Sequence, residues 1–376
     1  MRRSVPLTTV VREWGRIGIT SFGGPPAQVA LLRELCVDRQ RWIDAREFED
    51  ANAATQLLPG PGGTQLAIYC ARRAGGPAGM VAGGLAFILP GLLIVLAIAA
   101  VALSESPPAW IRAVGAGGVA AVVAVIVQAG LALGRSTLTA QHGAARWRAA
   151  AYAVLGAAAT IAVGPWVVLV LIGSGLVELA WRRRPGAVAS LSPAALVLAV
   201  ATLPALAWTA LKVGALSYGG GFVIIPLMQA DAVDTHGWMT DAEFANAVAY
   251  GQLTPGPVVH TVAMVGWAAA GLGGALLASA IAFAPSFLAV AALGNRFVQL
   301  RRSPSARAFL DGAGPAAVGA ILGAAVPLAY AIDEVWQWGV LAAAALVLLA
   351  RRPAIWALGG GALAGVTAWL AGAPIP

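Results

Sequence analysis

Two short motifs rich in glycine, proline and hydrogen-bonding side chains each occur twice in the sequence. Ser-Phe-Gly-Gly at 21–24 returns as Ser-Tyr-Gly-Gly at 217–220, and Gln-Leu-Leu-Pro-Gly-Pro at 56–61 returns as Gln-Leu-Thr-Pro-Gly-Pro at 252–257. The displacement is 196 residues in both cases, and sixteen of the forty-one positions from 21 to 61 are identical in the second copy. Glycine and proline interrupt helices, whereas serine and glutamine donate hydrogen bonds to anionic oxygens. The repeat predicts two similar halves with interrupted helices and exposed donors.

Two cations occupy equivalent places just before the first motif of each half. Arg16 corresponds to Lys212, and both lie in apolar stretches where a charge is costly and usually functional. Helices that begin after Pro26 and Pro61 each present about half a positive charge at their N-terminus, and anions bind there. Cations and helix ends together predict a site for a doubly charged anion.

The residues that we expect to contact the anion comprise both cations, members of the two motifs and their neighbours: Arg16, Ser21, Phe22, Gly23, Gly24, Gln56, Pro59, Gly60, Pro61, Gly62, Thr64, Lys212, Ser217, Tyr218, Gly219, Gly220, Gln252, Pro255, Gly256 and Pro257. Alternative interpretations are that Pro-Gly-Pro is only a turn and that Arg16 extends to the membrane interface.

Three further ionisable side chains lie close to the motifs. Glu47 and Glu243 are equivalent and are either helix caps or groups for gating or proton coupling. His260 corresponds to Thr64, so it is either a polar packing residue or a titrating group.

The composition indicates an all-α polytopic membrane protein. Of the 376 residues, 59% are hydrophobic and 11% are charged, compared with about 25% charged in soluble domains. The net charge of +8 comes from arginines in short loops, which does not favour nucleic-acid binding. We predict a first repeat at 1–181, a basic cytoplasmic linker at 182–192, and a second repeat at 193–376.

Each half is expected to have five membrane crossings, one of them broken, and one re-entrant hairpin, at 44–71 in the first half and 240–270 in the second. The remaining predicted spans are 77–103, 112–134, 148–163 and 165–181, then 272–293, 308–330, 335–350 and 354–371. Wherever a loop of one half is basic, the equivalent loop is not: 135–148 carries three arginines, whereas its counterpart carries Asp333 and Glu334. Because basic loops stay cytoplasmic, the two repeats are predicted to have inverted topology.

The repeated motifs, together with Trp42 and Glu47-Phe48, resemble the chromate ion transporter family in its long, two-domain form. The resemblance covers nearly the whole chain. It implies chromate efflux across the inner membrane, and sometimes sulfate-related transport. Tyr218 in place of Phe22 and Gly221 in place of Pro25 are departures between the halves, so the two breaks need not be equivalent.

Electrostatics favour efflux, because a dianion leaving an inside-negative cell gains about 4.6 kcal/mol per 100 mV. Transport of sulfate or another tetrahedral oxyanion, and an anion channel, are the alternatives. A membrane enzyme acting on phosphate groups is less favoured, because no paired His/Asp/Glu constellation appears in the apolar segments. We expect no metal, no cofactor and no nucleic acid, with the oxyanion and membrane lipid as partners. The expected location is the cell inner membrane, and a homodimer is compatible with the sequence.

Overall fold

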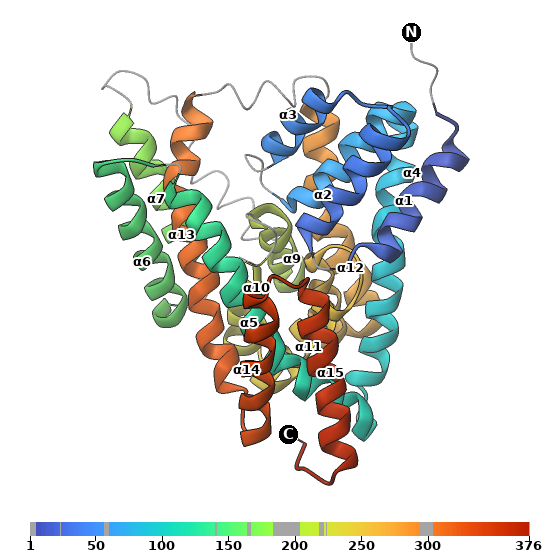
Figure 1. Ribbon diagram of the computed structural model, residues 1–376, viewed down its shortest axis with the longest axis vertical. Helices are drawn as coiled ribbons and strands as arrows, with labels where there is room; N and C mark the ends of the chain where they lie inside the picture. The colour runs from blue at the N-terminus through green and yellow to red at the C-terminus, as the bar shows by residue number, and fades with distance from the viewer. Residues whose placement is uncertain are drawn as a thin grey trace.

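Every regular element in the described part of the chain is a helix in the computed structural model (Figure 1). The structure describes residues 5–22, 24–55, 60–139, 141–163, 167–182, 204–217, 222, 224–293 and 304–375. Within these ranges four helical stretches are long and apolar enough to cross a membrane: Gly62–Ala102, Ala109–Thr139, Val258–Leu293 and Arg307–Tyr330. The protein is an all-α polytopic membrane protein, which confirms the predicted fold class.

The helices form two successive series along the chain. The first half contains α1 (Leu7–Thr20), α2 (Pro25–Arg33), the π-helix η1 (Glu34–Arg39), α3 (Ala45–Thr55), α4 (Gly62–Ala102), α5 (Ala109–Thr139), α6 (Ala144–Val163) and α7 (Val167–Arg182). The second half contains α9 (Ala205–Leu216), α10 (Ile224–Gln229), the π-helix η3 (Ala230–Thr235), α11 (Asp241–Leu253), the 3-10 helix η4 (Val258–His260), α12 (Thr261–Leu293), α13 (Pro304–Tyr330), α14 (Val335–Leu349) and α15 (Ala354–Leu370).

The local structure of the first half recurs in the second half. The first helix of each half ends at a serine, Ser21 after α1 and Ser217 after α9. A six-residue π-helix follows in both halves, at the same displacement of 196 residues. The long helices α4 and α12 are both kinked at a glycine with positive φ, 67° at Gly76 and 60° at Gly271. The sequence repeat is therefore also a repeat of helices, breaks and kinks.

The helix breaks coincide with the glycine and proline motifs. Gly24, at φ 74° and ψ −158°, separates α1 from α2, and Pro25 opens α2, where a missing N–H costs nothing. In the proline turns, Gly60 has φ 120° and Gly256 has φ 99°. Residues with a Cβ rarely adopt these angles. Glycine is therefore required where each turn reverses the chain.

The predicted spans coincide with helices. We expected a helix from Thr64 that ends at Arg72 and Arg73, followed by a separate span at 77–103. In the structure Gly75 and Gly76 have non-helical angles, so α4 consists of two helical segments that meet at this kink, and the second begins at the predicted start of the span. Most of the predicted linker, 183–192, lies outside the described residues.

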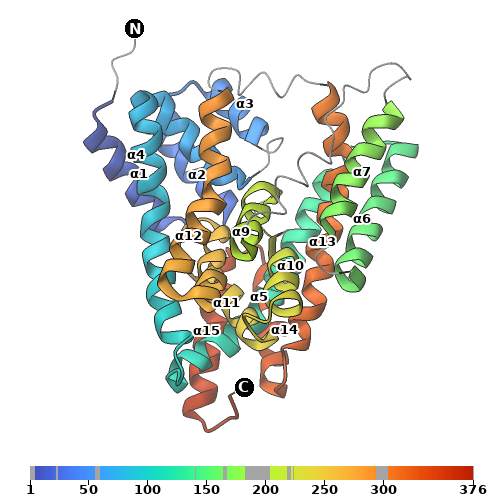
Figure 2. The ribbon, with the colours of Figure 1, turned by 180° about the vertical axis from the view of Figure 1, so that it is seen from behind.

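Corresponding long helices run in opposite directions along the molecule (Figures 1 and 2). The N-terminus lies at one end and the C-terminus at the other. The helix α5 begins near the C-terminal end of the molecule and rises toward the N-terminal end, whereas α13 descends in the opposite sense. The hairpin of α6 and α7 occupies the upper part in this view, and the hairpin of α14 and α15 occupies the lower part.

The two halves are interleaved through packing between helices of opposite halves. The helices α6 and α7 pack against α13, whereas α14 and α15 pack against α5, and α4 packs against α12. Small residues permit the close approach: a Cβ at Gly365 of α15 would overlap the carbonyl oxygen of Ala113, and a Cβ at Gly319 of α13 would overlap that of Ala153. Contacts between small residues of this kind hold membrane helices together.

A buried carboxylate ties α6, α7 and α13 together. Glu178, with 2% of its side chain exposed, accepts two hydrogen bonds of 2.9 Å from Arg148 and one of 2.8 Å from Arg182. Arg182 also pairs with Asp311 of α13 at 2.7 Å. Two guanidinium groups thus compensate the buried charge, as a desolvated carboxylate requires.

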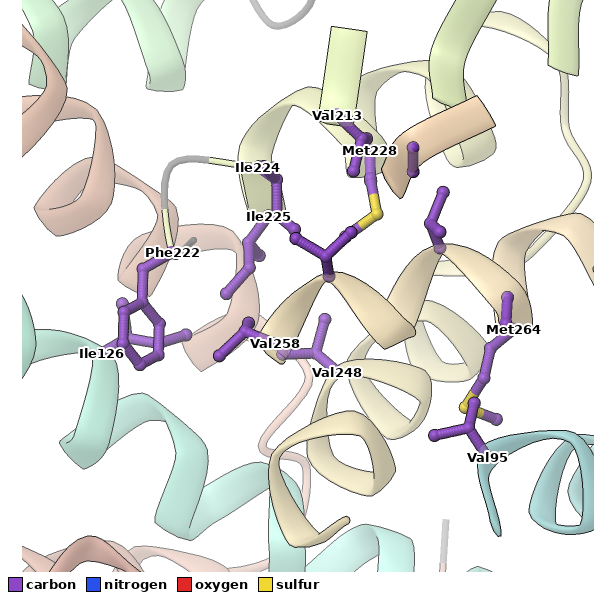
Figure 3. Packing of buried hydrophobic residues seen from close by; sticks show 14 of the residues in the cluster. Val95, Ile126, Val213, Phe222, Ile224, Ile225, Met228, Val248, Val258 and Met264 are labelled. Atoms are coloured by element: carbon purple, nitrogen blue, oxygen red, sulfur yellow. The ribbon is translucent and has the colours of Figure 1, made fainter. Parts of the chain in front are cut away.

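The apolar core continues across the boundary between the halves (Figure 3). Met264 of α12 is drawn beside Val95 of α4, and Phe222 beside Ile126 of α5. On the first helix pair, the indole N–H of Trp14 donates to the carbonyl of Ala67 at 2.8 Å and fixes α1 against α4.

We predict that Gly365→Ala lowers the thermal stability of the purified protein by several degrees, because the new methyl group would overlap the backbone of α5. Gly360→Ala, five residues earlier on α15, is the matched control, since a Cβ there meets no atom within 4 Å. In the control, helix propensity alone favours alanine by up to about 1 kcal/mol. The melting temperature of each variant is measured in detergent, with size-exclusion chromatography reporting the fraction that remains folded after heating. Equal melting temperatures for the two variants would contradict the proposed contact.

Candidate anion site

The two cations predicted from the sequence occupy different surroundings. The side chain of Arg16 is 52% exposed, and its Nη2 lies 3.4 Å from Glu13 of the same helix. The side chain of Lys212 is only 8% exposed, and its Nζ lies 2.5 and 2.7 Å from the two carboxylate oxygens of Asp231. The Thr209 hydroxyl donates to the same carboxylate at 2.7 Å. An incoming anion would therefore compete with a carboxylate at both cations.

Asp231 is a residue that the sequence reasoning missed. Its counterpart in the first half is Leu35, so the repeat gave no hint of a paired charge. The available signal was an acid in an otherwise apolar stretch of the second half, because such residues usually find a partner within the membrane. Asp231 lies in η3, and the break between α9 and α10 brings it back to Lys212.

The two proline turns lie at the boundary between the halves. The N–H of Gly256, in the turn of the second half, donates to the carbonyl of Ser21 in the first half at 3.1 Å. A Cβ built on Gly256 would lie 3.9 Å from the carbonyl oxygen of Gly18, and one on Gly60 would lie 3.4 Å from that of Gly214. Because Gly18 and Gly214 are equivalent positions, each turn rests against the end of the first helix of the other half.

Several hydroxyl and amide atoms around these turns are buried without a hydrogen-bond partner. Within the described residues they belong to Ser21, Gln28, Thr64, Ser217, Gln252 and Ser286. None of these side chains belongs to a residue more than 8% exposed. A buried polar group without a partner costs about 1–3 kcal/mol. Polar atoms of this kind are available to bind water or an anion.

The remaining predicted site residues divide into three groups. Gly24, Gly60, Pro61, Gly62, Pro255, Gly256 and Pro257 shape the breaks and turns described above. Phe22 is 38% exposed at the end of α1. Gly23, Gln56, Pro59, Tyr218, Gly219 and Gly220 lie outside the described residues.

The equivalent acids Glu47 and Glu243 have different partners. Glu243 forms a capping box with Thr240, whose backbone N–H donates to the carboxylate at 2.8 Å. Glu47 instead accepts hydrogen bonds from Arg73 at 2.5 Å and from the hydroxyl of Tyr69 at 3.0 Å. The structure thus gives Glu243 the role of a helix cap, whereas Glu47 links α3 to α4.

A cavity of about 430 Å³ lies between α6, α10 and α13, but its lining is acidic. Asp234 and Asp241 face it together with Gln229. Burial, and then the charge of Asp241, raise the pKa of the Asp234 carboxyl. Two carboxylates repel a dianion, so this cavity does not fit the predicted ligand.

Comparison with known proteins agrees with the motifs. The family model described as "Chromate transporter" matches residues 8–179 and 204–366. The chain belongs to the chromate transporter family. It is 32% identical over 336 residues to the "Chromate transport protein" of Cupriavidus metallidurans, with 86% of this chain and 82% of the relative covered. It is 31% identical over 339 residues to the protein of the same name from Pseudomonas aeruginosa, with 85% and 80% covered.

A third relative, the "Probable chromate transport protein" of Synechococcus elongatus, is 32% identical over 327 residues, covering 83% of this chain and 82% of the relative. No solved structure matches the chain. The family resemblance predicted from the motifs is confirmed. This member of the chromate transporter family thus combines broken helices, buried unpartnered donors and two paired cations at the boundary of its halves.

We predict that Asp231→Leu, which installs the residue found at position 35, sharply reduces the folded yield. Lys212 would then keep a buried charge without its partner, at a cost of about 3–5 kcal/mol. Adding Lys212→Met to the same chain removes that charge and is expected to restore folded protein. Membrane expression and size-exclusion profiles measure both variants. Equal yields of the single and double variants would show that the ion pair does not support the fold.

Proposed function

We propose that the protein exports chromate from the cell across the inner membrane. Membership of the chromate transporter family supports the transported class, since three relatives at 31–32% identity carry chromate transport in their names. The observation that carries the proposal is the group of buried, unpartnered donors beside the two interlocked proline turns. Hydroxyl and amide donors of this kind bind the oxygens of a tetrahedral oxyanion.

The proposed site combines these donors with the positive ends of the interrupted helices. The N-terminus of α4 follows Pro61 without a side-chain cap, so its first N–H groups are available to an anion. Arg16 and Lys212 supply charge, and each would exchange its carboxylate partner for the substrate during the transport cycle. The predicted site residues of both motifs enter the proposal in these roles.

Inverted topology of the two repeats is part of the proposal. The opposite directions of α5 and α13 support it (Figures 1 and 2). Inverted repeats with broken helices that meet at a common site are the architecture of many secondary transporters. Movement of one half against the other would then open the shared site first to one side of the membrane and then to the other, which is alternating access.

The membrane potential is the proposed driving force. A dianion that leaves an inside-negative cell gains about 4.6 kcal/mol per 100 mV, so export requires no coupled ion. Uptake against the same potential would need more than two protons per dianion. Sulfate shares the charge and shape of chromate, and it is the competing substrate that an assay must distinguish.

We expect reconstituted vesicles to transport chromate when a potential is imposed without a proton gradient. The flux should saturate with chromate concentration, whereas a channel would give fast, non-saturating flux. Competition by sulfate measures the selectivity between the two oxyanions. Absence of chromate flux under the imposed potential would reject potential-driven export.

Arg16→Gln is expected to abolish most of the chromate flux while the protein still inserts and folds. Arg12→Gln is a matched control, because Arg12 pairs with the same Glu13 carboxylate at the same 3.4 Å but lies one turn farther from the helix break. Its flux should stay close to that of the wild type. Equal flux in both variants would remove Arg16 from the site.

A further inference from the structure

The two proline turns have the same backbone form but different neighbours. Gly60 and Gly256 both take positive φ, and both rest against the first helix of the opposite half. The side chain four residues after each glycine differs, Thr64 in the first half and His260 in the second. The facing residue of the opposite long helix also differs, Ser286 of α12 in one case and Gly91 of α4 in the other.

Around Gly60 the neighbours are hydrogen-bonding side chains, and the nearest is the amide nitrogen of Gln65, 2.5 Å from a Cβ built on Gly60. A Cβ built on Gly60 would lie 3.1 Å from the Ser286 hydroxyl, so that hydroxyl points at the turn. Gln28 of α2 reaches the backbone of Gly63, where a Cβ would overlap its amide oxygen. The hydroxyls of Thr64 and Ser286 and the amide nitrogen of Gln28 are without partners, and these side chains belong to residues at most 1% exposed.

Around Gly256 a single imidazole occupies the equivalent space. A Cβ built on Gly91 would lie 2.6 Å from Cε1 and 2.8 Å from Nδ1 of His260, so the ring fills the room that a serine would need there. The ring also packs edge-on against Phe283, with 5.4 Å between the ring centres. His260 and Gly91 thus occupy the places that Thr64 and Ser286 have at the other turn, where the Gln65 amide also lies against Gly60.

We propose that the anion occupies only one of the two equivalent turns, the one at Gly60, and that Ser286 determines its binding there. This inference rests on the proposed transport function and narrows it to one site per chain. The unpartnered hydroxyls of Thr64, in the first turn of α4, and of Ser286 lie beside the N-terminus of α4, and a tetrahedral oxyanion supplies the acceptors that they lack. The His260 ring takes the place of an anion at the other turn.

The first test compares two serines of α12 in reconstituted vesicles. Ser286→Ala removes a donor aimed at the turn and should raise the chromate concentration for half-maximal flux about tenfold or more. Ser279→Ala is the control, because Ser279 is also buried on α12 but donates to the carbonyl of Ala275 at 2.7 Å. Its half-saturation should stay within about twofold of the wild type, since that bond is internal to the helix.

The second test counts bound anions on the purified wild-type protein by equilibrium binding of radiolabelled chromate. One anion per chain is expected, with binding weakened in Ser286→Ala and retained in Ser279→Ala. Two anions per chain would overturn the single-site inference, and so would unchanged flux and binding in a correctly folded Ser286→Ala variant. Absence of wild-type flux would instead reject the proposed transport function, which keeps the two failures distinguishable.

Discussion

The structure depends on the interlocking of each proline turn with the first helix of the opposite half. A broken helix within a membrane exposes backbone groups that lipid cannot satisfy, so another part of the protein must cover them. The N–H of Gly256 donates to the carbonyl of Ser21, and Gly60 rests against Gly214 in the equivalent place. Each break thus contacts the other half, which ties the halves into one unit and leaves their polar atoms at a shared boundary.

Charge within this boundary is balanced by carboxylates rather than left free. Lys212 is held by Asp231, and Arg16 faces Glu13. A buried ion pair stabilises less than its geometry suggests, because both charges lose water. Because the net stabilisation is small, an anion can replace the Asp231 carboxylate as the partner of Lys212 and keep the charge balanced. Substrate binding and rearrangement of the helix break would then be coupled through Lys212 and Asp231.

The two halves share a scaffold but have diverged in the side chains that fill it. Matching breaks, π-helices and glycine kinks preserve the backbone. The Ser286 hydroxyl and the Gln65 amide face one proline turn, whereas the imidazole of His260 lies against the other. Duplication thus supplied two equivalent frames, and substitution of a few buried residues made them chemically different.

Patterns along the chain were enough to establish the helical membrane class, the repeat, the positions of the breaks and the family. These follow from local rules: long apolar runs form spanning helices, and glycine with proline ends them wherever they occur. The same patterns placed a boundary between the first hairpin and the following span, where Gly75 and Gly76 have non-helical angles. Contacts between distant residues became visible only in the folded molecule. The pairing of Lys212 with Asp231, the interleaving of α14 and α15 with α5, and the approach of Ser286 to Gly60 join residues far apart in the chain or lacking a counterpart in the repeat. Packing between halves brings them together, and no periodicity along the sequence encodes it.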